Sequence, residues 1–506
     1  MLPMKDQLLN LCPVHKIKWK NYFANALSTG RPGAKVNAGR KHSSLKQYIL
    51  SIVLFIVSNT ITYAQFLPGI STGNYNGVIG VYTNPANALG QYKWDVHLFG
   101  ADILTGNKNG KVKLSDIGEE NYLRTKLIGL EGFNDDLVRV DVPAIGFLVG
   151  IGKKSSLAFT TRARVFLNAS HIDAKFVNAL ADDGTEIPGL PYTFQATQPT
   201  LVNGNGLTDY ALTWANELLN KGSHYLKGGV TVKYVSGVGN ISYQTKLAGT
   251  IHEDEEGTYM SPGAGTIDMR SGGSAFLDDF SAGNLFEFNG AGVGLDLGFS
   301  YEYRPQSWKD ATTLSAHAGI PYLFKFSASV LDIGKVKFDA LEENSKSYNT
   351  HIPASDKFYF SEFAAIAVGD ATEVFDKFPK YFTQTKQNTG TYKVKLPSTL
   401  QLGFDYNMGK GFFVSADAQI GFNTKDEWQS IRTFNSYAIT PRYERRKLGV
   451  FLPMTYHQLS GFSVGAAFHF GPLYIGSGSI ISLLTGGSKQ ADAFFGFRFG
   501  GLHSKK

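Results

Sequence analysis

Several segments of the chain alternate strictly between apolar and polar residues, and this period constrains the fold more than any other feature. In VGLDLGFSYEYR, which starts at Val293, every second residue is apolar or aromatic, and Gly, Asp, Ser, Glu or Arg stands between. The same period recurs in LQLGFDYN from Leu400, SLAFTTRARV from Ser156 and FFGFRFG from Phe494. A period of two predicts β-strands with one apolar and one polar face.

Two all-β architectures share this alternation, a soluble sandwich and a transmembrane barrel. No stretch after residue 64 approaches the roughly 18 consecutive apolar residues of a membrane helix. Strands of about ten residues, with charges and glycine on the polar face and aromatic residues near the ends, are typical of a barrel. We therefore expect an all-β fold, a transmembrane antiparallel β-barrel, which closes because an open edge would leave unpaired backbone groups in lipid.

The expected number of strands is about 14. Fifteen candidate strands lie near residues 92, 137, 157, 207, 224, 240, 286, 321, 397, 412, 430, 448, 461, 473 and 490. Single-chain bacterial barrels have even strand numbers, so at least one of these assignments is wrong. Counting back from a periplasmic C-terminus places the tight connection at 408–410 in the periplasm and the long stretches 253–284 and 339–393 outside the cell.

The segment Lys46–Gln65 has the layout of a secretory signal. A cationic flank precedes an apolar run from Tyr48 to Val57, and the small residue Ala64 stands before Gln65. The run is too short to cross a bilayer as a helix but suits a signal peptide. We expect cleavage after Ala64, with residues 1–64 removed; residues 1–45 reflect either a start assigned too early or a real extension.

Removal of residues 1–64 changes the charge and the cysteine content. Lys and Arg fall from 49 to 40 and Asp and Glu from 42 to 41, so the net charge of +7 disappears. The near-neutral remainder has no compact basic cluster, which argues against a nucleic-acid partner. The single cysteine, Cys12, is also removed, which excludes disulfides and thiolate sites from the remaining chain.

The turn Asn84-Pro85-Ala86, soon after the signal, resembles the hatch signature of FadL-like fatty-acid transporters and of PorV-like barrels of Bacteroidota. Further segments are similar to an uncharacterised Bacteroidota outer-membrane family: SLAFTTRARV, LKGGVTVKYVSG, GAGVGLDLGFSYEYRP, SVLDIG and LPSTLQLGFDY. This resemblance implies an outer-membrane barrel of residues 92–506, whose residues 65–91 form a plug in the lumen. It also implies outer-membrane lipid and lipopolysaccharide as surroundings.

Charged residues on the polar faces are the candidate lumen site. Such charges could hold a carboxylate ligand or line a polar path. The alternative, which we favour, is that they pair with one another and contact the plug. They are Arg162, Arg164, Asp296, Glu302, Arg304 and Asp417.

An irregularity in LVRVDVPAIGFLVGIG makes Pro143 a candidate lateral gate. Val138, Val140 and Val142 carry the apolar face before Pro143, whereas Ile145 and the alternate residues after it carry that face beyond. A bulge would restore the alternation, and proline lacks one ladder donor. In FadL-like barrels a kinked strand opens the wall sideways; the alternative is a register correction without an opening.

The sequence predicts no cofactor, no metal site and no enzyme. GFSVG at 461–465 matches the hydrolase pattern G-x-S-x-G, but Ser463 sits in an alternating strand where an elbow and helix are needed. The resemblance to FadL-like transporters implies the first function class, binding or transport of a small hydrophobic molecule. The second is a surface interaction protein that serves type IX secretion, as PorV-like barrels do, and the third, least favoured, is an outer-membrane enzyme.

Overall fold

The computed structural model describes residues 67–108, 110–116, 133–181, 187–273, 288–308, 310–365, 371–424, 427 and 429–503. The expected signal segment lies outside these residues.

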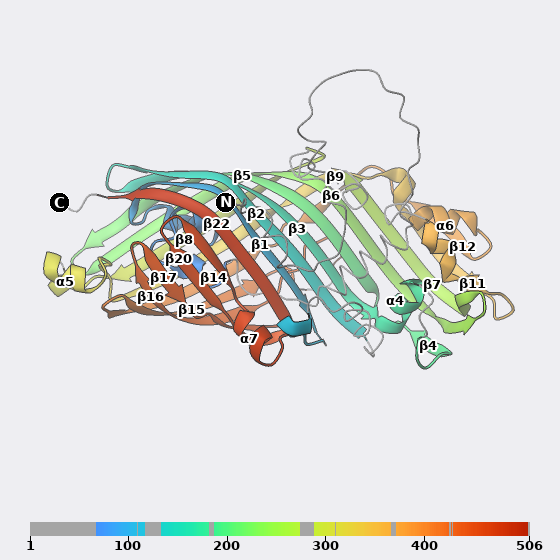
Figure 1. Ribbon diagram of the computed structural model, residues 1–506. Helices are drawn as coiled ribbons and strands as arrows, with labels where there is room; N and C mark the ends of the chain where they lie inside the picture. The colour runs from blue at the N-terminus through green and yellow to red at the C-terminus, as the bar shows by residue number, and fades with distance from the viewer. Residues whose placement is uncertain are drawn as a thin grey trace, which may run out of the picture.

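The described chain forms one antiparallel sheet that closes on itself, because the last strand pairs with the first (Figure 1). The wall strands are β1 (Tyr92–Asn107), β2 (Phe133–Ile151), β3 (Ser155–Asp173), β5 (Thr200–Lys221), β6 (His224–Asp254), β8 (Gly290–Tyr303), β9 (Phe324–Asp339), β13 (Thr391–Lys395), β14 (Thr399–Gly409), β15 (Phe412–Gly421), β16 (Ser436–Arg445), β17 (Leu448–Phe451), β18 (Met454–His457), β19 (Gly461–Val464), β20 (Ala466–Phe470), β21 (Leu473–Ser477) and β22 (Gln490–Leu502).

These strands occupy 14 positions around the wall, which confirms the expected number. Three positions are each filled by two short strands in line. β13 and β14 both pair with β9, β17 and β18 both pair with β16, and β19 and β20 continue one another. Pro397 and Pro453 fall at two of these interruptions, where a missing backbone donor breaks the ladder.

One of the fifteen candidate strands was wrong. The segments near 224 and 240 are two halves of β6, a single strand of 31 residues. The first half pairs with β8 and the second half pairs with β7 (Gly257–Gly273). Residues 235–242, where the sheet divides, are buried on both faces, so the alternation lapses there and imitates a strand boundary.

The long stretches 253–284 and 339–393, which were expected to be long outer connections, contain regular structure in their described parts. The second half of β6 continues into an ancillary sheet. This sheet also contains β7, β4 (Tyr192–Gln195), β10 (Lys346–Ile352), β11 (Phe358–Tyr359) and β12 (Phe382–Gln387). Ile251, Met260, Tyr348 and Phe358 belong to its buried core. Three short helices accompany it, at the right of Figure 1: α4 (Ala174–Ala181), η8 (Phe360–Ala365) and α6 (Ala371–Lys377).

The opposite end of the barrel has tight connections at 152–154, 222–223, 410–411, 446–447 and 471–472. The remaining described helices are η1 (Ile70–Thr72), η2 (Gly77–Tyr82), η3 (Pro85–Ala88), η4 (Leu114–Asp116), η6 (Gln306–Trp308), α5 (Ala311–Ala316), η7 (Glu342–Asn344) and α7 (Ile480–Thr485). None of the helices in the described part of the chain is long and apolar enough to span a membrane.

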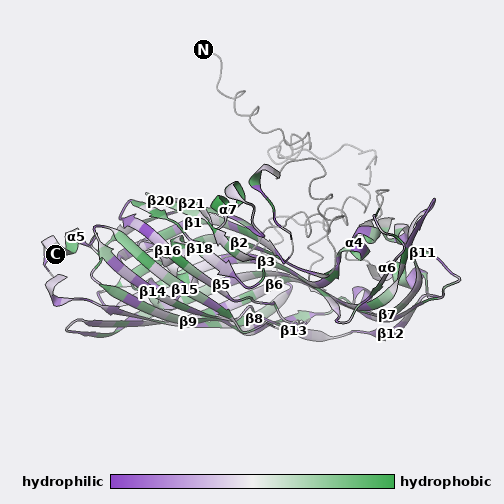
Figure 2. Ribbon diagram, turned by 90° about the horizontal axis from the view of Figure 1, so that it is seen from below, coloured by the Kyte–Doolittle hydropathy of each residue, from purple (hydrophilic) through white to green (hydrophobic). Residues whose placement is uncertain are grey.

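The wall has an apolar outer face and a polar inner face, and this division follows the alternation in the sequence. Phe299 and Ile439 expose about half of their surface, whereas Ser300 and Thr440 on the same strands are buried in the interior. Hydrophobic positions recur along the strands in Figure 2. Apolar side chains on the outside of a closed barrel are what lipid contact requires.

Candidate functional site

The described residues 67–91 form a plug inside the barrel, and the Asn84-Pro85-Ala86 turn joins this plug to the wall. The side-chain oxygen of Asn84 accepts the backbone N–H of Ala86 at 2.9 Å, and its amide donates to the Phe299 carbonyl of β8 at 3.0 Å. Proline at the first position of η3 fits, because that position needs no donor. A side chain at the wall glycine Gly229 would stand 2.5 Å from Pro85, so glycine admits the turn.

Wall carboxylates hold the backbone of the plug. Glu444 of β16 accepts the N–H groups of Asn74 and Tyr75 at 2.8 and 3.0 Å. Asp95 of β1 accepts the N–H of Val78 at 3.0 Å and pairs with Arg498 of β22 at 2.9 Å. Charge-assisted bonds to backbone donors are strong, so these contacts fix the plug to two separate parts of the wall.

A cavity of about 160 Å³ lies between the plug and the wall. Polar groups of the plug, including Asn76, Tyr82 and Asn87, form one side, and residues of β2, β3, β9, β14 and β15 form most of the rest. The lining mixes charged side chains with apolar ones such as Phe166 and Leu331. It therefore suits a compound that has both a polar and an apolar part.

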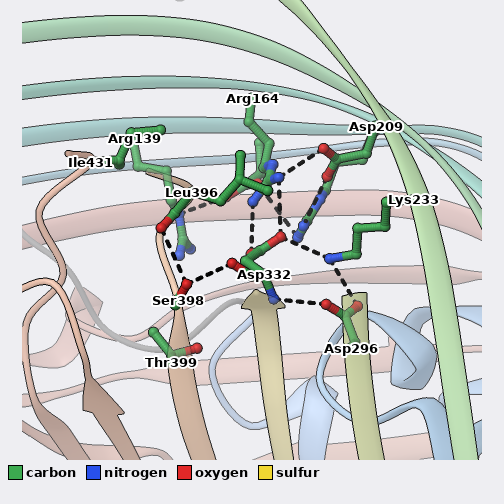
Figure 3. Close-up of polar contacts among 12 residues, drawn as sticks. Arg139, Arg164, Asp209, Lys233, Asp296, Asp332, Leu396, Ser398, Thr399 and Ile431 are labelled. Carbon is green, nitrogen blue, oxygen red and sulfur yellow. Dashed lines mark hydrogen bonds and ion pairs between the residues drawn. The ribbon is translucent and has the colours of Figure 1, made fainter. Parts of the chain in front are cut away.

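A network of buried ion pairs crosses the lumen beside this cavity (Figure 3). Arg164 of β3 contacts Asp209 of β5 at 2.7 Å and Asp332 of β9 at 2.9 Å. Lys233 of β6 contacts both Asp332 and Asp296 of β8 at 2.8 Å. These charges compensate one another inside the barrel, as buried charges must.

The six predicted lumen residues fall into three places. Arg162 lies beside Arg164 and contacts Asp209 at 3.2 Å, so both arginines share the network with Asp296. The other three residues lie apart. Glu302 and Arg304 pair with each other at 2.6 Å, and Asp417 of β15 lines the cavity on another side.

Sequence reasoning missed three members of the network. Asp209 and Lys233 lie on the inward faces of β5 and β6 and are buried, so a stricter use of the period could have found them. Asp332 could not be placed in this way, because it has a left-handed backbone (φ 57°) next to a register shift between β8 and β9. A bulge changes which face each later residue occupies.

The predicted bulge at Pro143 is present. On β2 the register to β3 shifts between Pro143 and Gly146. The ladder from β2 to β1 is also interrupted at this height. Residues 98–101 of β1 and 142–145 of β2, all of them described, form no ladder pairs with each other, whereas the β1–β2 pairing is regular before and after them.

Side chains form hydrogen bonds with the carbonyl groups that the bulge leaves without ladder partners. Thr161 of β3 donates to the Ile145 carbonyl at 2.8 Å, and His97 of β1 contacts the Ala144 carbonyl at 2.9 Å. On the lumen side, Tyr82 of the plug donates to the Thr161 carbonyl at 3.2 Å and also lines the cavity. The cavity thus lies next to the interrupted ladder.

A second hollow, of about 850 Å³, lies on the apolar outer surface over β8, β9, β14, β15 and β16. Aromatic side chains such as Phe326 and Tyr437 border it, and Gly403 lines both this hollow and the lumen cavity. The wall is thin there, but the ladder is continuous, since Gly403 pairs with Ser327 and with Asp417. The hollow is therefore not a break in the wall.

The described residues show no arrangement suited to catalysis at the positions considered from the sequence. Ser463 is buried within β19, where it contacts the Thr455 hydroxyl at 2.7 Å and the Gly478 carbonyl at 3.2 Å. The strand–elbow–helix setting of a hydrolase serine is absent at this described site. No group of three or more His, Cys, Asp or Glu in the described ranges could hold a metal ion.

A closed barrel of 14 antiparallel strands, apolar outside, polar inside and filled by an N-terminal plug, is a transmembrane β-barrel. The chain belongs to a family of unknown function, DUF5723, whose profile matches residues 85–478. No curated protein matches the chain.

Several solved structures are similar to the chain. The toluene transporter TbuX of Ralstonia pickettii has 12% identity and a TM-score of 0.41, over 88% of this chain and 100% of that one. The toluene transporter TodX of Pseudomonas putida has 11% identity and a TM-score of 0.42, over 85% and 95%. A FadL homologue of Pseudomonas aeruginosa has 10% identity and a TM-score of 0.39, over the same shares. At these values the likeness assigns no function.

Proposed function

We propose that the protein is an outer-membrane barrel that takes a small hydrophobic or amphipathic compound into its lumen and releases it sideways into the membrane. Residues 1–64 are the removed leader, residues 65–91 the plug and residues 92–506 the barrel. The end with tight turns faces the periplasm, because short turns inside and long connections outside are usual for such barrels. The ancillary sheet then stands outside the cell.

The interrupted ladder between β1 and β2 carries this proposal. Both ends of the plug are fastened to the wall, through Leu67 to Asp102 at 3.4 Å and through Leu89 to Lys227 at 2.6 Å, which opposes passage along the axis. The interruption lies next to the cavity on its inner side. On its outer side, exposed apolar side chains such as Phe99 and Ile145 face the lipid. A cavity of about 160 Å³ is smaller than usual drug-sized sites, so the compound is small.

Disulfide clamps test the sideways path. Val96 pairs with Phe147 below the interruption and Ile103 pairs with Val140 beyond it, so cysteines at both pairs would lock β1 to β2. We expect the oxidised double clamp to reduce cellular uptake of labelled ethylbenzene or octanoate at least tenfold, and a reductant to restore it. The matched control is Leu402→Cys with Ala418→Cys, a pair on the continuous β14–β15 seam. Undiminished uptake through the oxidised clamp would refute the sideways path.

The ancillary sheet supports a second candidate function, binding of a secretion-system or other protein at the cell surface. It is a folded unit with its own buried core, beyond what a pore needs. Burial and the neighbouring Asp376 raise the pKa of the Tyr348 hydroxyl, which donates to that carboxylate at 2.9 Å and fixes α6 to β10. Photo-crosslinking from Lys357, compared with Lys447 at the other end, tests this role; partners captured equally from both positions would contradict it.

A further inference from the structure

The two strands at the interruption bulge at the same height. β2 shifts register to β3 between Pro143 and Gly146, and β1 shifts register to β22 between His97 and Phe99. Leu98 and Phe99, adjacent in sequence, are both exposed to the outside. At this height β1 and β2 form no ladder pairs with each other, so side-chain contacts take the place of backbone hydrogen bonds between the two strands.

The His97 side chain spans that stretch. Its Nδ1 lies 2.9 Å from the Ala144 carbonyl of β2, and its Nε2 lies 3.0 Å from the Tyr474 hydroxyl of β21. A carbonyl only accepts, so Nδ1 carries the proton and donates; Nε2 of the neutral ring then accepts from Tyr474. His97 is completely buried, which leaves water no part in either contact.

The wall is built to let Tyr474 reach His97. Tyr474 extends beneath β22 and β1, where Gly496 and Gly100 stand. A side chain at Gly496 would meet the Tyr474 hydroxyl at 2.1 Å, and one at Gly100 would meet it at 2.6 Å and His97 at 3.2 Å. Either replacement would expel the tyrosine from its position, so both glycines serve this contact.

Tyr474 also packs in one buried cluster with residues of the plug. It is 1% exposed and belongs to a buried cluster with Leu67, Ile70 and Ile79 of the plug. The other wall members of this cluster are Phe451, Ala467 and Phe494. A displacement of the plug would therefore loosen the packing that orients the Tyr474 hydroxyl toward His97.

We propose that His97 is the latch that holds the wall closed between β1 and β2, and that Tyr474 couples this latch to the plug. The latch would control the proposed sideways release, so its role in transport rests on the proposed function. When the plug shifts, Tyr474 leaves His97, the contact to the Ala144 carbonyl weakens, and the wall opens beside the cavity. His97 is a positioning residue in this scheme and contacts no transported compound.

Hydrogen–deuterium exchange of the full-length purified barrel tests the latch without reference to transport. We expect His97→Phe, which keeps the ring and removes both polar atoms, to speed amide exchange over 142–147 at least tenfold. His97→Gln, which keeps a donor for the Ala144 carbonyl, should restore most of the protection. Tyr474→Phe should speed exchange over the same residues by a smaller factor.

The matched control is His469→Phe. His469 is another buried wall histidine whose ring contacts a backbone carbonyl, that of Gly471, but its strand has a continuous ladder to β21. We expect no change over 142–147 in this variant. Unchanged exchange over 142–147 in His97→Phe, or an equal increase over the β14–β15 seam, would overturn the latch.

Uptake separates the latch from the proposed function. His97→Phe should raise uptake of labelled ethylbenzene several-fold, and the oxidised double clamp should abolish the increase. Faster exchange in His97→Phe together with uptake that ignores the clamp would keep the latch and refute sideways release. Unchanged exchange together with clamp-sensitive uptake would refute the latch and keep sideways release.

Discussion

Asp332 is the residue on which the cross-lumen network depends. It accepts from Arg164 and Lys233, which come from different strands, and its own backbone N–H donates to Asp296 at 2.7 Å. Removal of one partner from a buried ion pair leaves an uncompensated charge, which is costlier than replacement of the whole pair. The network is therefore a stabilising element as well as part of the cavity wall.

Asp332→Asn should lower the free energy of unfolding by about 3 kcal/mol, because Arg164 and Lys233, both buried, each lose one of their two anionic partners. Urea-induced unfolding in detergent micelles, followed by tryptophan fluorescence, measures the change. Glu427→Gln is the control, since Glu427 forms an exposed pair with Lys395 at 2.5 Å and should cost under about 1 kcal/mol. Similar losses in the two variants would show that the buried network contributes no more to stability than an exposed ion pair.

Single residues could be predicted only as far as the two-residue period of a strand assigns each one to the outer or the inner face. Arg162, Arg164 and Asp296 were found because they lie on the polar face of alternating segments, and they do meet in the network. The partners of a buried charge were not predictable, since pairing depends on which strands face each other across the lumen. His97 was missed for a similar reason: its role depends on an interruption that two strands create together.

At the scale of elements, the plug depends on a few wall side chains rather than on its own secondary structure. Its helices are short 3-10 turns, and the Glu444 carboxylate satisfies the N–H groups of Asn74 and Tyr75 between them. Buried donors without an acceptor are costly, about 1–3 kcal/mol each. A wall variant can thus loosen the plug without any change in the plug sequence.

Glu444→Ala should increase hydrogen–deuterium exchange over residues 74–78 and raise the conductance of single barrels in planar bilayers. Both effects follow from the loss of the acceptor for two backbone donors of the plug, of which Tyr75 is buried and Asn74 is partly buried. Asp376→Ala is the control, since Asp376 lies in α6 beside the ancillary sheet and pairs with Lys346 at 2.6 Å. Exchange over 74–78 equal to that of the unaltered protein would contradict an anchoring role for Glu444.

Elements were predictable where one face meets lipid and the other meets the lumen. The strand positions and the bulge at Pro143 followed from the period and its lapse. β6 was divided wrongly because both of its faces are covered where the sheet divides, so residues 235–242 carry no usable pattern. The ancillary sheet was overlooked because its short strands pair across long sequence separations.

At the scale of the whole molecule, the proposed orientation can be checked by labelling. The expected mature chain has no cysteine, so single substitutions report cleanly. Lys380→Cys, next to the ancillary sheet, should react with a membrane-impermeant maleimide on intact cells. Lys447→Cys, at a tight turn, should react only after the outer membrane is opened. The reverse pattern would invert the proposed topology.

Processing and localisation give a further whole-molecule prediction. The exported protein should fractionate with the outer membrane, migrate faster on a gel before boiling than after it, and begin at Gln65 by terminal sequencing or intact mass. A closed barrel resists detergent unfolding until heated, which explains the gel shift. Recovery as a soluble periplasmic protein, or residues preceding Lys46 on the exported chain, would contradict this.

The length of β6 determines how far the molecule reaches from the membrane. At about 3.3 Å per residue, its 31 residues extend on the order of 100 Å, and a tilt of about 40° leaves roughly 75 Å along the barrel axis. The apolar belt of such a barrel takes up only about 25 Å of this height. In the proposed orientation the ancillary sheet therefore stands above the lipid headgroups, within the sugar layer of the cell, where an antibody or a bacteriophage would encounter it before any other part of the protein.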